Sequence, residues 1–209
     1  MAKKIIVTVA RQYGSGGREI GERIAEILSL PLYDKEIIKD AAEAGNLHED
    51  VAKLTDETAV NSLLYTLAVG SNPIGTVANF GYKMPINDKL FILQSNLIKD
   101  YAKKGSCVII GRCADYVLRA EENIFRLFIY GDLEHRKERV KARHPEIKPS
   151  QITDVINKTD KRRASYYNFY TGNKWGKYDN YDMAVNSSTL GIEGTAQLIA
   201  AAIKKLIEE

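Results

Sequence analysis

Short apolar segments alternate with longer amphipathic segments along the chain, which is the pattern of strands separated by helices. Residues 4–10 (KIIVTVA) form the first apolar, β-branched run and predict a buried strand. Strands separated by helices imply a parallel sheet that is covered on both faces, so we predict a doubly wound α/β fold with three layers. Further strands are predicted at residues 107–110, 125–130 and 181–185, with a very short one at 32–33, and helices at about 20–28, from 35, and at about 90–101, 133–144, 149–170 and 199–207.

Length and composition are those of a globular protein. The chain has 209 residues, of which 44% are hydrophobic and 27% charged, so we treat residues 1–209 as a single domain. No apolar run approaches the ~18 residues of a membrane span, and the run after the basic N-terminus is too short for a secretory signal. Cys107 and Cys113 fit neither a CxxC motif nor a zinc spacing. We therefore expect a cytoplasmic protein with no membrane partner.

The charge balance gives no indication of a nucleic-acid partner. The chain has 30 Lys and Arg against 27 Asp and Glu, a formal net charge of +3. Composition alone therefore does not predict a nucleic-acid partner, and it leaves the oligomeric state open. One long stretch, Gly70–Pro85, has no periodicity and contains two prolines and three glycines, which predicts a mobile loop near a site.

A glycine-rich loop lies between the first predicted strand and the first predicted helix. Glycines free backbone N–H groups to converge on an anion, and the helix that follows adds the positive end of its dipole. Two known fingerprints fail here, because Glu19 stands where GxGxxG needs its last glycine and Glu22 stands where the Walker pattern needs lysine. The loop predicts phosphate binding, with a plain strand-to-helix turn as the alternative. The predicted phosphate-binding residues are Gly14, Ser15, Gly16, Gly17 and Arg18.

Further motifs follow this loop in a fixed order. They are Asp34-Lys35 after the second predicted strand, Gly111-Arg112 after the third, Asp160 and Arg163 on the long helix, and residues 181–188 (YDMAVNSS) at the last strand. Together with Gly14-Ser15-Gly16, this order resembles the cytidylate-kinase-like branch of the P-loop nucleoside monophosphate kinases over essentially the whole chain. The resemblance implies a P-loop fold, ATP as the phosphoryl donor, Mg²⁺ that arrives with the nucleotide, and nucleotide substrates. It also implies a helical acceptor-side insertion at residues 34–87 and a lid-like helical region at residues 132–180.

The chain departs from that family at positions that neutralise phosphate charge. Gly17 stands where the P-loop has its lysine, and Glu19 where the family has the hydroxyl that binds Mg²⁺. Arg18 is the cation of this turn, and arginine can bind phosphate oxygens with its planar fork; a solvated surface arginine is the alternative. The other departures are Arg11 at the first P-loop glycine, Ile110 at the strand-end carboxylate, Cys113 at an aspartate, and Asp40 at the acceptor arginine, which leaves Lys35 and Lys39 as the cations there.

Two helices carry further candidate side chains. The basic helix at residues 133–144 resembles the lid of these kinases, although Glu134 and Glu138 at helical spacing also fit a solvated face. The helix at residues 149–170 combines arginines with tyrosines, which could stack on a base or pack on the core. Asp160 beside Arg163 is the more informative pair, because a carboxylate can accept a hydrogen bond from the exocyclic amine of cytosine.

These observations lead to a functional prediction. We expect transfer of the ATP γ-phosphoryl group to a nucleoside monophosphate or a related small acceptor. Arg18, Arg112 and Arg163 are the predicted catalytic residues, and no metal ligand is predicted. Because the P-loop lysine is missing, the alternative is a nucleotide-binding regulatory module that has lost catalysis. The predicted acceptor-binding residues are Asp34, Lys35, Asp160 and Arg163.

Overall fold

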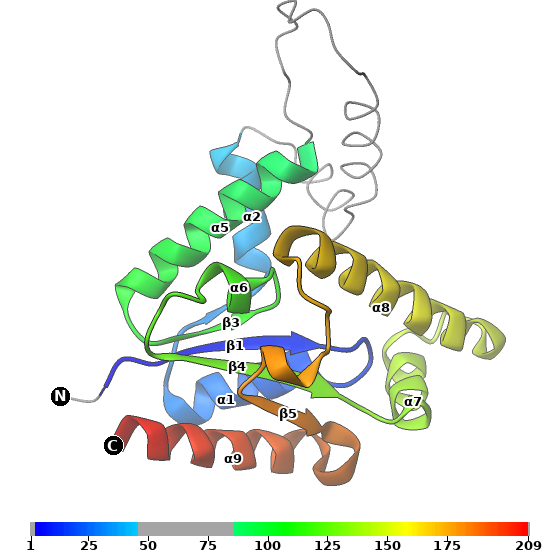
Figure 1. Cartoon of the computed structure of the whole chain (residues 1–209). Coiled ribbons are helices and arrows are strands. Elements are labelled where there is room, and N and C mark those ends of the chain that lie inside the picture. The colour runs from blue at the N-terminus through cyan, green and yellow to red at the C-terminus, as the bar shows by residue number, and fades with distance from the viewer. Residues whose placement is uncertain (1–2, 46–85, 209) are drawn as a thin grey trace, which may run out of the picture.

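The fold is built around a five-stranded parallel sheet (Figure 1). The computed structural model describes residues 3–45 and 86–208. Along the sheet the strands follow the order β2-β3-β1-β4-β5, and every neighbouring pair is parallel. This confirms the predicted α/β fold with a parallel sheet. The strands are β1 (Ile6–Arg11), β2 (Leu32–Tyr33), β3 (Cys107–Ile110), β4 (Ile124–Tyr130) and β5 (Met183–Asn186).

Helices cover both faces of the sheet and give the three predicted layers. On one face α1 (Gly17–Leu28) and α9 (Ser187–Glu208) lie side by side (Figure 1). Their apolar side chains join one face of β1, β3 and β4 in the main core. The opposite face is covered by α2 (Lys35–Ala44), α5 (Ile86–Lys104) and the short α6 (Ala114–Val117), with a second core beneath them.

Two helices stand at the carboxyl end of the sheet. These are α7 (Leu133–Arg143) and α8 (Pro149–Thr171), which pack on each other beyond the ends of β1 and β4 (Figure 1). The sequence did not predict α6 or the 3₁₀ turn η1 (Tyr178–Asn180), because each is too short to show a periodicity. The predicted loop at 70–85 lies outside the described residues, as does the stretch 46–85 of the predicted insertion at 34–87.

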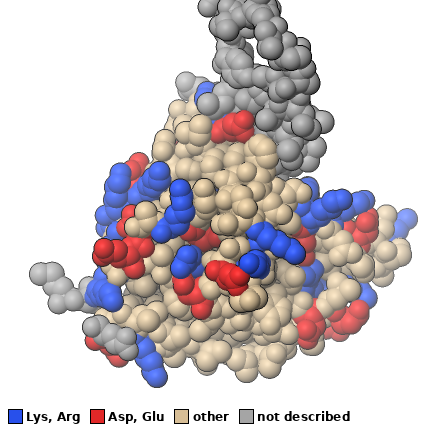
Figure 2. Space-filling view, viewed as in Figure 1, with Lys and Arg blue, Asp and Glu red and all other residues tan. Residues whose placement is uncertain are grey.

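Charged side chains of both signs are interspersed on the surface drawn in Figure 2. On that face, the described residues form no continuous basic surface of the kind that follows a nucleic-acid backbone. Among the described residues, no helix is both long enough and apolar enough to cross a bilayer.

Candidate active site

The glycine loop connects the end of β1 to the start of α1. Gly14 and Gly16 both have left-handed backbone angles, with φ of 79° and 77°, and Gly16 caps the N-terminus of α1. Ser15 is buried and closes the loop: its hydroxyl donates to the Gln12 carbonyl oxygen at 2.9 Å and accepts from the Gly17 N–H at 3.3 Å. The first N–H groups of a helix have no partner within it, so a loop of this shape can surround an anion.

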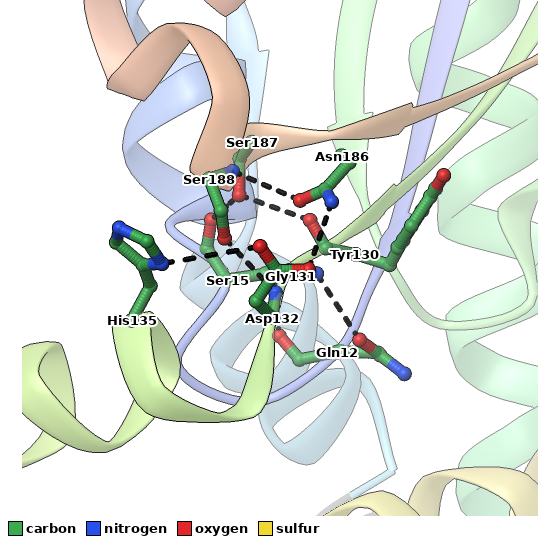
Figure 3. Close-up of polar contacts among 9 residues, drawn as sticks. All are labelled: Gln12, Ser15, Tyr130, Gly131, Asp132, His135, Asn186, Ser187 and Ser188. Carbon is green, nitrogen blue, oxygen red and sulfur yellow. Dashed lines mark hydrogen bonds and ion pairs between the residues drawn. The ribbon is translucent and has the colours of Figure 1, made fainter.

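Polar contacts fix the loop to the ends of two neighbouring strands (Figure 3). The Ser187 hydroxyl, at the start of α9, lies 2.6 Å from the Ser15 carbonyl oxygen and 2.9 Å from that of Tyr130. The Gly131 N–H donates to Gln12 Oε1 at 3.2 Å. The loop is therefore held at the carboxyl ends of β1, β4 and β5. Figure 3 also shows the contacts among Asp132, His135, Asn186 and Ser188 that extend this network.

Asp160 connects the same loop to α7 and α8. Its carboxylate accepts the Tyr13 N–H at 2.7 Å and the Arg136 guanidinium at 2.8 Å. Burial raises the pKa of Asp160, while the Tyr13 N–H and the positive charges of Arg136 and Arg163 act in the opposite direction. In this structure the predicted acceptor ligand Asp160 thus holds the loop, and Arg163 lies beside it with its guanidinium donating to the Arg11 carbonyl oxygen at 3.1 Å.

The predicted lysine substitute, Arg18, lies on the side of α1 that faces Asp34, the residue before α2. Its Nε atom is 2.8 Å from the Asp34 carboxylate and 3.2 Å from that of Glu22. Asp34 is buried at the N-terminus of α2, and the neighbouring Lys35 is exposed. The structure brings together two predicted site residues, Arg18 and Asp34, by pairing them with each other.

Three arginines converge beyond the end of β1. Arg11, Arg112 and Arg163 line a cavity of about 30 Å³, together with Asp115 and Tyr167. Arg112 is buried with φ of 57°, and burial lowers its pKa. Burial raises the pKa of Asp115, which accepts the Tyr167 hydroxyl at 2.6 Å. Sequence analysis had selected Arg112 and Arg163 but had given no role to Arg11 or Asp115.

A second cavity, of about 170 Å³, opens between the loop and α7. On its α7 side, Arg139 pairs with Glu19 at 3.2 Å, and Arg143 contacts the same carboxylate oxygen. Two of the predicted lid arginines are therefore held by the first turn of α1. The cavity is lined by Gly14, Ser15, His135, Arg136, Glu138, Arg139, Ser187, Ser188, Gly191 and Ile192.

Comparisons with known proteins bear on this arrangement. A profile of the cytidylate kinase-like family matches residues 6–189. The chain belongs to this family. Membership supports a phosphotransferase that uses ATP, and it confirms the predicted resemblance. A search among curated proteins gave no match.

Solved structures support the same fold for this cytidylate kinase-like chain. An uncharacterized protein from Eubacterium ventriosum is 26% identical, with a TM-score of 0.70 and coverage of 96% of this chain and 99% of its own. A shikimate kinase from Bacteroides thetaiotaomicron is 13% identical, with a TM-score of 0.54 and coverage of 97% and 99%. A gluconokinase from Sinorhizobium meliloti is 15% identical, with a TM-score of 0.51 and coverage of 100% and 96%. At these identities the two kinases support the fold alone.

Proposed function

We propose that this protein transfers the γ-phosphoryl group of ATP to a nucleoside monophosphate or a closely related small acceptor. The observation that carries the proposal is the placement of the loop. Two left-handed glycines cap α1 at the carboxyl end of the central strand, and three arginines converge next to that end. Phosphoryl transfer depends mainly on positioning and on neutralising charge, which such a site can supply.

On the donor side, the loop at residues 14–17 would hold the phosphates of ATP through its backbone N–H groups. The 170 Å³ cavity next to it is bounded by the loop, by α7 and by the start of α9, and it would take the rest of the donor. Arg139 lies at the mouth of the loop, since a Cβ added to Gly16 would be 3.0 Å from its guanidinium. From there it can move onto the phosphates when its contact with Glu19 opens.

At the point of transfer, Arg112 and Arg163 would neutralise charge between donor and acceptor. An oxygen of the acceptor phosphate forms a bond to the γ-phosphorus while the bond from that phosphorus to the β–γ bridging oxygen breaks. ADP leaves with the electron pair. An acceptor phosphate that is already ionised has no proton to lose, so this step needs no general base.

On the acceptor side, Asp34, Lys35 and Asp160 remain proposed contacts. Lys35 is exposed at the start of α2, where a mobile cation can meet an incoming anion. Asp34 would have to share its contact with Arg18, and Asp160 its contacts with Tyr13 and Arg136. Arg18, in turn, can serve the donor phosphates only after it leaves Asp34.

The residues present fit a Mg²⁺ ion that is carried by the nucleotide. Among residues 3–45 and 86–208, no group of three histidine, cysteine or acidic side chains could form a metal cage. Mg²⁺ in phosphoryl-transfer sites is commonly held by substrate phosphates and one or two carboxylates. Glu19 fits that role, because its Oε2 atom is buried without a hydrogen-bond partner among the described residues. When bound, the ion would neutralise phosphate charge during transfer.

The direct test is phosphoryl transfer from ATP and Mg²⁺ to a panel of nucleoside monophosphates that includes CMP and dCMP. We expect turnover with at least one acceptor, and a decrease in kcat of about 100-fold in the R112Q variant, as for other groups that stabilise transition-state charge. Turnover is measured by the release of ADP and by chromatography of the nucleoside diphosphate product. The matched control is R23Q, because Arg23 is partly exposed on α1 and pairs with Glu26 and Glu193. If the wild-type protein binds ATP but phosphorylates no monophosphate, the proposal is wrong and the regulatory module takes its place.

Replacing Glu19 tests whether its carboxylate holds the lid arginines away from the donor. Without divalent cations, we expect E19Q to bind ATP about three- to tenfold more tightly, because two partly exposed ion pairs no longer compete with the phosphates. With Mg²⁺ this gain should disappear, since the ion then loses a carboxylate. Titration calorimetry measures both, with E26Q as the control, because Glu26 pairs with Arg23 on the same helix. Unchanged affinity in both conditions would contradict the role of Glu19.

A further inference from the structure

Arg11 is the last residue of β1, and its side chain runs through a space that two glycines leave open. A Cβ at Gly17, the first residue of α1, would overlap the Arg11 Cβ. A Cβ at Gly111, just after β3, would overlap the tip of the Arg11 guanidinium. The absence of side chains at these two positions therefore allows Arg11 to extend from the start of α1 to the end of β3.

Arg11 lines the same small cavity as Arg112 and Arg163. Among the described residues that line this cavity, these three are positively charged, and Asp115, which accepts the Tyr167 hydroxyl at 2.6 Å, is negatively charged. Arg112 also interacts with Asp34, and Arg163 with Asp160, and neither carboxylate belongs to this lining. A cavity lined mainly by charges of one sign attracts an ion of the opposite sign, which here is an anion. At about 30 Å³, the cavity admits a group of one or two water volumes, which is the scale of a phosphate oxygen or two.

The glycine loop has no lysine or arginine side chain placed to neutralise a bound phosphate. Gly17 stands where the family has its P-loop lysine, and Arg18 is engaged by Asp34 and Glu22 on the other side of α1. The missing side chain at Gly17 is the same feature that gives the Arg11 side chain its room. A side chain at position 17 would therefore exclude the Arg11 side chain from its present place.

We propose that Arg11 joins Arg112 and Arg163 in a three-guanidinium site for a phosphate oxyanion at the point of transfer, where it supplies the positive charge that the loop lacks. The inference rests on the proposed function and deepens it by adding a catalytic residue. Arginine suits this position, because its planar fork binds two phosphate oxygens at once and its charge survives burial. The oxyanion is either the γ-phosphoryl group of the donor or the phosphate of the acceptor.

Binding of three anions to the full-length chain shows whether the oxyanion is the donor γ-phosphoryl group or the acceptor phosphate. Titration calorimetry would use a non-hydrolysable ATP analogue with a β–γ imido bridge, ADP, and CMP. We expect R11Q to weaken binding of the ATP analogue roughly 10- to 100-fold, the usual loss for a hydrogen bond to a charged group, and to leave ADP nearly unchanged. R11K should recover part of the loss, because it restores the charge without the fork. If CMP alone is weakened, the site is supported with the acceptor phosphate as its anion.

Controls keep this test independent of folding and of turnover. R23Q is the matched control, since Arg23 lies on the outer side of α1 and pairs with Glu26 and Glu193. Circular dichroism melting shows whether each variant is folded. Wild-type affinity of R11Q for all three anions would overturn the inference, as would a loss that appears in R18Q instead, or a wild-type protein that binds none of them. A wild-type protein that binds the analogue but phosphorylates no acceptor would end the proposed function and still leave the effect of R11Q measurable.

Discussion

The D160A variant is expected to lose about 3–5 kcal/mol of its free energy of unfolding, the typical cost of removing one partner of a buried ion pair. Asp160 and Arg136 have only 16% and 7% of their side chains exposed, so solvent screens their contact little. The substitution leaves the Arg136 charge buried and also removes the acceptor of the Tyr13 N–H. Urea unfolding followed by circular dichroism measures the loss.

Two further variants show whether the loss of stability in D160A comes from the buried ion pair. D160N keeps an oxygen for the Tyr13 N–H but removes the charge, so it should lie between the wild type and D160A. D154A changes another aspartate of α8. The Asp154 side chain is 62% exposed and pairs with Lys158, so we expect its loss to lower the free energy of unfolding by less than about 0.5 kcal/mol. If D160A and D154A lose equal stability, Asp160 is not a structural link between the loop and helices α7 and α8.

The G14A variant is expected to lose donor binding and about 2–5 kcal/mol of stability. Two costs add here. The left-handed φ of 79° is unfavourable for alanine by about 1–2 kcal/mol, and a Cβ would also lie 2.8 Å from the backbone oxygen of Arg136 and 3.0 Å from Val140, an overpacking that costs about 1–3 kcal/mol. Because both contacts belong to α7, the clash also displaces the helix that bounds the donor cavity.

A matched glycine separates these two costs. Gly172 caps the end of α8 with φ of 70°, and a Cβ there would meet nothing within 4 Å. G172A should therefore lose only the backbone cost of about 1–2 kcal/mol and keep its affinity for ATP. Thermal melting and nucleotide titration of both variants measure the difference. Equal losses of stability and unchanged nucleotide binding in both would contradict the close approach of α7 to the loop.

The fold could be predicted largely from the apolar pattern. The strand at residues 107–110 was predicted with its exact bounds, and that at 125–130 within one residue, because buried parallel strands have nearly continuous β-branched runs. The start of the last strand was predicted two residues early, because Tyr181 has an aromatic side chain that is typical of strands but precedes Met183, where pairing begins. Short elements such as α6 offer no period to detect.

The contacts of the site could be predicted less well than its location. The glycine loop was found because its residues are adjacent in the sequence. The partners of Asp160, by contrast, come from the loop and from α7, and no spacing indicates that Tyr13 and Arg136 meet at one carboxylate. Likewise, the sequence contains several arginines near predicted strand ends. Only the packed structure distinguishes Arg11, which passes between two glycines, from Arg18, which faces Asp34.

The central position of β1 affects how the chain folds during synthesis. Ile6 pairs with both Cys107 and Ile124, so β1 has no neighbour in the sheet until about 100 further residues have been translated. At about 5–20 residues per second, its apolar segment waits for roughly 5–20 s before β3 emerges. Such distant pairing also slows folding, because a long loop has to close before any contact stabilises it. The glycine loop that follows β1 is therefore translated well before Gly131 and Ser187, whose contacts hold it in place.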